Sequence, residues 1–128
     1  MILDTDILID VLRGYTPTQN KLQTLEQQHI PLRTTSISVF ELFQDMQQLS
    51  AEKQEKIKSL ISSLQIISFD ELAAEEAGMI RAKLQREGNI LDPEDCMIAG
   101  IALTHQEILL TRNSKHFSRI TGLKIQDY

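Results

Sequence analysis

The sequence has one cysteine and no long apolar run, and both shortages exclude whole classes of protein. No disulfide can form within the chain, because Cys96 stands alone, and this fits a reducing compartment. The apolar runs extend over only a few residues, too few to cross a bilayer. The opening Met-Ile-Leu-Asp lacks a basic segment and reaches an acid at once, so we expect no secretory signal. These absences favour a cytoplasmic protein without a membrane anchor.

Internal repeats, low-complexity tracts and linkers are absent as well. The 128 residues are 41% hydrophobic and 24% charged, which is typical of an ordinary globular domain. A chain of this length can bury a core without disulfides or a structural metal. We therefore expect a single domain over residues 1–128.

Excess positive charge is also missing, since the net charge is −5. This argues against a protein that holds nucleic acid by bulk electrostatics. The segment 112–124 nevertheless contains no acid and four of the 13 basic residues, namely Arg112, Lys115, Arg119 and Lys124. The segment is either a solvated basic loop or a strip that contacts phosphates.

Short strand patterns alternate with helical patterns along the chain. Strands are predicted at 1–4, 32–35, 65–69, 107–111 and 123–125. Helices are predicted at 5–13, at 18–28, from Ser36 or Ser38 to about Gln48, after the cap Ser50, from the cap Asp70 to Gly88, and from Asp92-Pro93 to about His105. This alternation predicts a parallel sheet with helices on both faces, where ligands bind beyond the carboxyl ends of the strands.

Three acids lie in apolar surroundings near predicted strand ends. Asp4 ends the first strand, Glu41 lies in Ser-Ile-Ser-Val-Phe-Glu-Leu-Phe, and Asp95 heads the apolar face of the last long helix. Each has a purely structural alternative. Asp4 or Asp6 could cap the first helix, Glu41 stands at capping-box spacing from Ser38, and Asp95 could belong to a capping motif.

Taken together, the positions of the three acids predict a single site. In a parallel sheet all of them can meet at the carboxyl edge, where carboxylates repel one another unless a divalent cation neutralises them. Oxygen ligands without a His or Cys cluster favour Mg²⁺ or Mn²⁺ over Zn²⁺. Such a site can activate water for attack on a phosphodiester.

Four motifs, in order, carry a family resemblance over nearly the whole chain. They are Ile-Leu-Asp-Thr-Asp at 2–6, Ser-Ile-Ser-Val-Phe-Glu-Leu at 36–42, Asp-Pro-Glu-Asp-Cys-Met-Ile-Ala-Gly-Ile-Ala at 92–102 and Leu-Leu-Thr-Arg-Asn-Ser-Lys-His-Phe at 109–117. The sequence thereby resembles the PIN-domain family, and within it the VapC toxins. The resemblance implies an α/β fold of three layers, with a short, mostly parallel central sheet flanked by helices.

The resemblance also implies a Mg²⁺- or Mn²⁺-dependent endoribonuclease. Asp4 and Asp95 would bind the metal directly, and Glu41 would bind it or orient the attacking water. Thr111 and Asn113 would position water or phosphate, while the RNA backbone would be held by Arg112, Lys115 and Arg119.

One motif departs from the family. His116 stands where many relatives have a fourth acid before the phenylalanine. Either three acids hold one metal, or Asn113, Asp92 or Asp6 completes the shell. His116 itself is either a surface histidine or a contact to phosphate or water.

The resemblance further implies a homodimer and a VapB-type antitoxin that lays a helix in a groove and inserts a basic residue into the acidic site. The substrate would be a structured RNA such as tRNA or rRNA. Two alternatives stay open. The chain could be a phosphatase of the haloacid-dehalogenase type, with Asp4 as nucleophile and Asp6 as acid–base. It could also be a non-catalytic PIN-like module that binds a partner.

Overall fold

Five short parallel strands form the centre of the computed structural model, which describes residues 1–128. They are β1 (Ile2–Leu3), β2 (Arg33–Thr35), β3 (Gln65–Ile67), β4 (Leu109–Leu110) and β5 (Ile125–Gln126). The strand order is β3-β2-β1-β4-β5, and every neighbouring pair is parallel. The predicted α/β class with a parallel sheet is confirmed, and β1 takes the central position.

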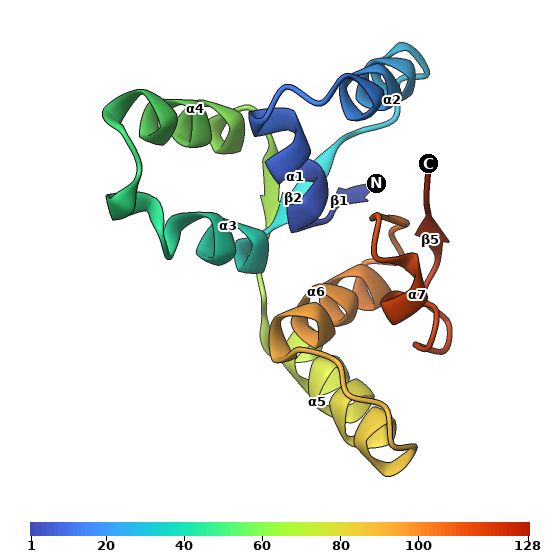
Figure 1. The fold of residues 1–128 in the computed structure, drawn as a ribbon. Coiled ribbons are helices and arrows are strands. Elements are labelled where there is room, and N and C mark those ends of the chain that lie inside the picture. The colour runs from blue at the N-terminus through green and yellow to red at the C-terminus, as the bar shows by residue number, and fades with distance from the viewer.

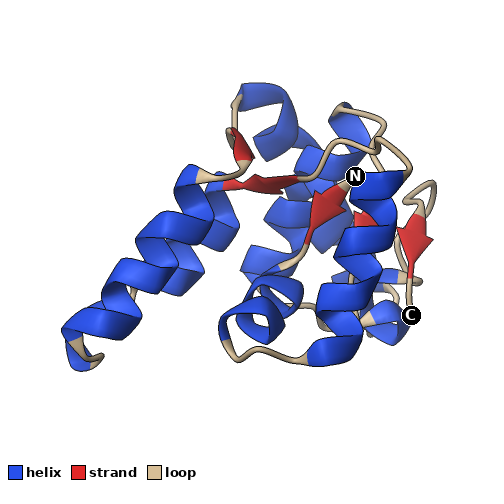
Figure 2. Ribbon diagram, turned by 90° about the horizontal axis from the view of Figure 1, so that it is seen from above, coloured by secondary structure: helices blue, strands red, loops and turns tan.

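Helices cover both faces of this sheet. They are α1 (Thr5–Leu12), α2 (Thr16–Gln27), α3 (Ser36–Phe43), α4 (Ala51–Ser62), α5 (Glu71–Arg86), α6 (Pro93–Thr104) and α7 (Ser114–Phe117), with a 3₁₀ turn, η1 (Met46–Gln48). Figure 1 shows α1, α2 and α4 on one side of the strands and α5, α6 and α7 on the other. The view from above shows the short strands enclosed among helices (Figure 2). None of the helices combines the length and apolar character that a bilayer crossing requires.

Alternation along the central strands divides the core into two parts. Successive side chains of a strand point to opposite faces of the sheet. Ile2 and Leu109 accordingly join the core under α5 and α6, whereas Leu3 and Leu110 join the core under α1 and α4. β1 therefore contributes one side chain to each part of the core. Both side chains are completely or almost completely buried.

The helix after β2 begins and ends earlier than its sequence pattern predicts. Ser36 or Ser38 was the expected cap, but Thr35 takes this position, and its hydroxyl accepts a hydrogen bond from Ser38 N at 3.0 Å. Thr35 ends β2 in an extended conformation, which leaves its side chain free to cap. The helix stops at Phe43 and does not reach Gln48, because the chain tightens into η1. Two further expected caps, Ser50 and Asp70, are confirmed.

A glycine permits the close approach of α5 and α6. A Cβ atom at Gly100 would lie 2.5 Å from the carbonyl oxygen of Ala73 and 3.1 Å from Cβ of Ala77. Both alanines face Gly100 from α5 and are buried. This contact holds α6 against α5 and thereby sets the position of Asp95 in the first turn of α6.

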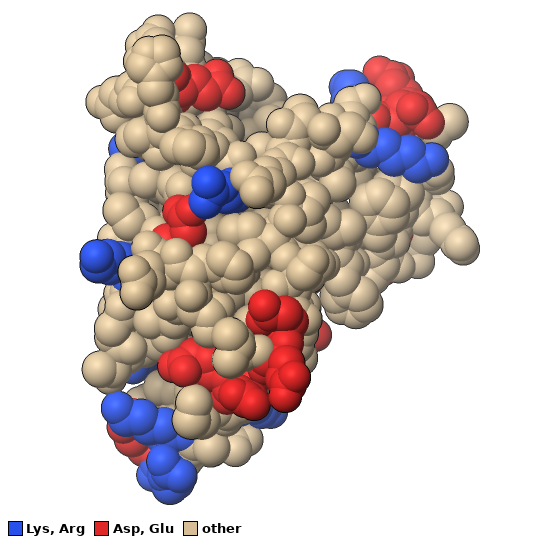
Figure 3. All heavy atoms as spheres, turned by 180° about the vertical axis from the view of Figure 1, so that it is seen from behind, with Lys and Arg blue, Asp and Glu red and all other residues tan.

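On the back of the molecule, the charged side chains of α5 change from acidic at its start to basic at its end. Its first half contains Glu71, Glu75 and Glu76, and its last turn contains Lys83 and Arg86. Figure 3 shows acidic atoms gathered over this region and basic atoms at the far tip. The arrangement complements the helix dipole, with acids near the positive end and bases near the negative end. We therefore attribute this acidic patch to helix stability.

Candidate active site

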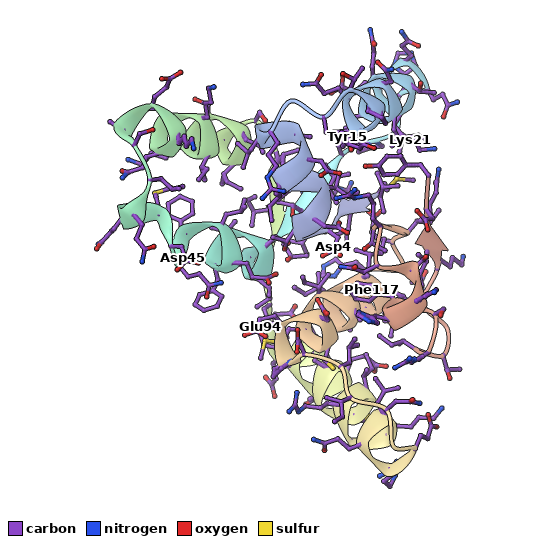
Figure 4. All side chains as sticks on the ribbon, in the orientation of Figure 1. Asp4, Tyr15, Lys21, Asp45, Glu94 and Phe117 are labelled. Atoms are coloured by element: carbon purple, nitrogen blue, oxygen red, sulfur yellow. The ribbon has the colours of Figure 1, made fainter.

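The predicted acids meet at the carboxyl edge of the sheet. Asp4 directly follows β1, and Thr111 directly follows the neighbouring strand β4. The order of strands changes direction between β1 and β4, which is where open parallel sheets bind ligands. Figure 4 shows Asp4 between α1 and α6, with Glu94 at the start of α6 on the same side.

Asp4 is a buried carboxylate with two hydrogen bonds. Its side chain caps α1, since Oδ1 accepts from Thr5 N at 2.8 Å, and Oδ2 accepts from the hydroxyl of Thr111 at 2.7 Å. The residue is only 3% exposed. Burial, together with the nearby charge of Asp6, raises the pKa of Asp4 to about 7. The capping alternative is therefore correct for Asp4, and the same residue also lies at the predicted site.

Asp6 has an unsatisfied buried oxygen. Its Oδ2 accepts from the backbone N–H of Arg112 at 2.9 Å and lies 3.4 Å from the hydroxyl of Thr111. Its Oδ1 is the one buried side-chain nitrogen or oxygen atom without a hydrogen-bond partner. Burial raises the pKa of Asp6 as well. Such an atom needs a water or a cation to compensate for its lost hydration.

Glu41 reaches the site from α3. Its Oε1 accepts a hydrogen bond from the hydroxyl of Thr5 at 2.7 Å, and that hydroxyl lies 3.0 Å from Oγ of Ser38. The capping-box alternative is wrong, because Ser38 lies inside α3 and Thr35 is the cap. Burial raises the pKa of Glu41, and the charges of neighbouring acids, Glu94 first among them, add to this effect.

Asp95 completes the group from the first turn of α6. Burial, together with the charges of Glu41 and Asp92, raises its pKa to about 6, although His116 opposes them. His116 therefore lies near enough to Asp95 to influence its charge. Asp92 takes the predicted N-cap position before Pro93, but its side chain makes no capping hydrogen bond. The carboxylate of Asp92 instead adds negative charge to the site.

The charges of these acids raise one another's pKa values, but the acids do not surround a single point as the ligands of a bound metal would. No three His, Cys, Asp or Glu side chains are placed to ligate one ion. The donors nevertheless fit a hard cation, since they are all carboxylates, their pKa values are raised, and Asp6 Oδ1 lacks a partner. Mg²⁺ commonly uses one or two carboxylates and keeps several waters. The donor set therefore fits Mg²⁺ or Mn²⁺ held partly through water.

The loop after β4 supports the acids through Thr111. This residue is completely buried, and its hydroxyl donates to Asp4 and accepts from the backbone N–H of Asn113 at 3.0 Å. Asn113 stands at the N-cap position of α7 without a capping side-chain bond. The guanidinium of Arg112 pairs with Asp10 at 2.9 Å. The remaining predicted residues of this segment are exposed, namely Lys115, His116 and Arg119.

Four residues of the site or its support were not predicted from the sequence. Thr5 donates to Glu41, Ser38 lies within hydrogen-bond distance of Thr5, and Glu94 adds charge beside Glu41. Thr5 and Ser38 are polar positions within two of the four motifs, which is the signal that could have found them. Asp10 interrupts the apolar run from Ile7 to Leu12, an unusual place for an acid.

An apolar groove of about 460 Å³ adjoins the acidic group. Glu41 lines the groove and also belongs to the acidic group, so the two meet at this residue. The apolar part of the lining comes from α1, α3, the segment before α4 and α4 itself, namely Ile9, Leu12, Leu42, Leu49 and Ile57. Charged side chains stand around it, namely Arg13, Asp45, Lys53 and Lys56.

Comparisons with known proteins agree with this architecture. The sequence profile described as PIN domain matches residues 1–123. The chain is 30% identical over 129 residues to the tRNA(fMet)-specific endonuclease VapC of Shigella flexneri, covering 99% of this chain and 96% of that protein. It is also 30% identical to ribonuclease VapC1 of Methanocaldococcus jannaschii, covering 99% of this chain and 87% of that protein.

Solved structures of VapBC assemblies contain the same fold. A chain in the VapBC2 structure from Rickettsia felis, bound to a promoter DNA fragment, superposes with a TM-score of 0.89 at 26% identity, covering 99% of this chain and 97% of that one. A chain in the DNA-bound VapBC structure from Salmonella typhimurium gives a TM-score of 0.87 at 29% identity, covering 98% and 96%. The fold, the four motifs and these similarities place the chain in the PIN-domain family, among the VapC-type proteins.

Proposed function

We propose that this protein is a metal-dependent endoribonuclease and the toxin of a toxin–antitoxin pair. The observation that carries the proposal is the group of carboxylates at the β1–β4 edge, in which Asp4 is buried and Asp6, Glu41 and Asp95 are half-buried. The pKa of Asp4 is raised there to about 7 and that of Asp95 to about 6. Perturbed carboxylates at a strand edge are typical of functional sites. The relatives named ribonuclease or endonuclease VapC support the same activity.

Asp4 and Asp95 hold Mg²⁺ or Mn²⁺ in this proposal, and Glu41 binds it or orients the attacking water. The orphaned oxygen of Asp6 supports a further role for Asp6 in completing the shell. When bound, the metal polarises a phosphate oxygen and lowers the pKa of water. Thr111 acts through Asp4, because its hydroxyl is buried against that carboxylate.

The substrate proposed is a structured RNA, with transfer RNA favoured over ribosomal RNA. Two relatives, from Shigella flexneri and Salmonella typhimurium, are named tRNA(fMet)-specific endonucleases. Lys115 and Arg119 are exposed beyond β4 and are suited to contact the RNA backbone. Asn113 and His116 are suited to contact phosphate or water, since both are exposed next to the acids.

The proposed partner is a VapB-type antitoxin whose helix occupies the apolar groove. Helix-in-groove recognition requires an apolar channel of the kind that Leu12, Leu42 and Leu49 line here. Glu41 joins the groove to the acidic group, so a basic side chain of the antitoxin would extend from the groove toward the acids. The solved VapBC assemblies support this pairing.

We also propose a homodimer. Phe40 and Phe43 on α3 are 54% and 38% exposed, and large exposed aromatic side chains mark association surfaces. Light scattering on the purified chain tests this: a mass of two chains is expected, and a mass of one chain would refute it.

The phosphatase alternative receives no support. The match to the PIN domain over residues 1–123 points to a different family. An assay of RNA cleavage by the purified protein distinguishes the enzyme from the non-catalytic alternative.

The experiment is cleavage of RNA by the purified protein, freed of antitoxin, in Mg²⁺, Mn²⁺ or EDTA. Total tRNA and rRNA serve as separate substrates, and Asp95→Asn is the control. We expect metal-dependent cleavage of tRNA that the variant lacks. No cleavage by folded protein in either metal would favour the binding module.

A further inference from the structure

Asp10 is a buried acid that the proposed reaction does not use. It lies on α1, and its side chain is 5% exposed. Its Oδ1 accepts from Nη2 of Arg112 at 2.9 Å, and its Oδ2 accepts from the hydroxyls of Thr18 at 3.0 Å and Tyr128 at 3.3 Å. One carboxylate therefore joins α1, α2, the loop after β4 and the residue beyond β5. A buried carboxylate that accepts hydrogen bonds from separate segments fixes the position of these segments relative to one another. We call this group of contacts the Asp10 junction.

Arg112 connects this junction to the acidic site. Its guanidinium pairs with Asp10 and lies over the ring of Tyr15, 5.7 Å from the ring centroid. Its backbone N–H donates to Oδ2 of Asp6 at 2.9 Å. Figure 4 shows Tyr15 in the connection between α1 and α2. A single residue thus touches Asp10 with its side chain and a site carboxylate with its backbone.

The anchored side chain restricts the backbone of the loop. Arg112 follows Thr111 directly, and the hydroxyl of Thr111 donates to Asp4 at 2.7 Å. If the guanidinium were free, the loop could rotate its peptide planes and release both carboxylates. Pairing with a buried acid removes that freedom, because breaking the pair would leave the charge of Asp10 uncompensated.

A second ion pair provides a natural comparison at the other end of β4. Glu107 lies just before β4 and pairs with Arg33 and with the N-terminal ammonium, which is 2.7 Å away. Ion pairs thus hold β4 at both ends. The pair at the amino end lies away from the acids, whereas the pair at the carboxyl end is one residue from Thr111.

We propose that Asp10 is a positioning residue for the metal site, acting through Arg112 on Asp6 and, through Thr111, on Asp4. This inference rests on the proposed function. It assigns the guanidinium of Arg112 to anchoring the loop, and leaves contacts to the RNA backbone to Lys115 and Arg119.

The test compares Asp10→Asn, Arg112→Gln and the double variant by calorimetric titration with Mn²⁺ and by hydrogen exchange of the Arg112 amide. Asp10→Asn alone removes a negative charge, which by itself would weaken cation binding. The double variant restores the charge balance but not the anchor. We expect both Asp10→Asn and the double variant to bind Mn²⁺ about 10-fold more weakly, the usual effect of losing an outer-shell partner. Amide exchange at Arg112 should accelerate in both.

Glu107→Gln is the matched control, since it removes the same charge from the other ion pair. It should lower thermal stability and leave Mn²⁺ affinity unchanged. Thr18→Val is a milder variant that removes one donor to Asp10 without any change of charge, and should shift affinity and exchange in the same direction. Wild-type affinity in the double variant would overturn the proposal, because charge alone would then explain Asp10→Asn.

The exchange measurement separates this inference from the proposed function. If the wild-type protein binds no Mn²⁺, the proposed metal site fails, but faster exchange of the Arg112 amide in Asp10→Asn still supports the anchor. Unchanged exchange in a folded Asp10→Asn variant overturns the positioning role whatever the metal does.

Discussion

Asp4 is the residue at which stability and the proposed activity oppose each other. Burial removes its hydration, and two hydrogen bonds, from Thr5 N and the Thr111 hydroxyl, compensate only in part. Its pKa is consequently raised to about 7. A carboxylate in this condition is costly to the fold when charged, and it is also well prepared to bind a cation.

Asp4→Asn should therefore separate the two properties. We expect RNA cleavage to fall at least about 100-fold, because direct ligands matter more than outer-shell partners. We expect the metal-free variant to melt about 3–10 °C higher than wild type at pH 8, since no buried charge remains. Asp70→Asn is the matched control, because Asp70 caps α5 as Asp4 caps α1 and Asn caps equally well. A lower melting temperature for Asp4→Asn would contradict this account.

The metal-free protein should lose stability as the pH rises from 5 to 8. The unfolded chain releases the Asp4 proton near the ordinary pKa of 3.8, whereas the folded chain keeps it to about 7, so the folded state binds more protons in between. Asp95 acts in the same direction up to about pH 6. Glu107 acts oppositely, but at lower pH: although its burial raises the pKa, the N-terminal ammonium lowers it overall.

Thermal melts in EDTA and in saturating Mn²⁺ measure this dependence. Metal present at 100 times its dissociation constant should stabilise the protein by about 2.7 kcal/mol at pH 8. The same metal concentration should stabilise it less at pH 5, where protons compete for the carboxylates. Equal stabilisation at both pH values would show that the cation binds away from these carboxylates.

At the scale of elements, the site depends on contacts that bring α1, α3 and α6 together. The hydroxyl of Thr5 links α1 to Glu41 of α3, and Gly100 lets α6 lie directly on α5. The first contact depends on the hydroxyl of Thr5, and the second depends on the absence of a side chain at Gly100. Substitutions that change one such group should affect one element's placement.

Gly100→Ala should destabilise the protein, and Gly78→Ala should not. At Gly100 the added methyl group would meet the carbonyl oxygen of Ala73 at 2.5 Å, an overlap that costs about 1–3 kcal/mol. At Gly78, also helical, nothing lies within 4 Å, so alanine should stabilise α5 by about 0.5–1 kcal/mol. Urea unfolding of the two variants measures both values, and equal effects would refute the close packing.

Thr5→Val should reduce cleavage about 10-fold, because Glu41 loses the donor that orients it. Thr5→Ser keeps the hydroxyl and should retain activity close to wild type. Initial rates at saturating metal and RNA make the comparison. If valine and serine act alike, the hydroxyl has no role in orienting Glu41.

At the scale of the whole molecule, the fold places an apolar groove next to the acidic group. We expect Leu49→Lys to weaken neutralisation by the antitoxin while RNA cleavage continues, since a charge would enter the groove that we propose for the antitoxin helix. Leu72→Lys is the control, because Leu72 is 65% exposed on α5, outside the groove. Inhibition of cleavage by added antitoxin is the measurement. Full inhibition of Leu49→Lys would place the antitoxin elsewhere.

The sequence by itself determined the kind and order of the strands and of the longer helices, but it did not predict the short helix α7 or the turn η1. The predicted elements are marked by local signals, namely apolar periodicity, capping residues such as Ser50 and Asp70, and the glycine after α5. Such signals can be recognised in the sequence without knowledge of the fold. The alternation of strands and helices then restricted the sheet to a parallel arrangement. That arrangement was enough to predict that Asp4, Glu41 and Asp95 lie at one edge.

Only the tertiary structure decided how these acids are held. Thr5 and Glu41 are 36 positions apart, and Asp10 and Arg112 are 102 positions apart. Partners so distant are chosen by the packing of whole elements, and no local pattern records them. For the same reason Asp4 is both the cap of α1 and a member of the acidic group, and Asp6 is the acid with an unpartnered oxygen. Burial, which raises the pKa values of these carboxylates, is likewise a property of the folded chain alone.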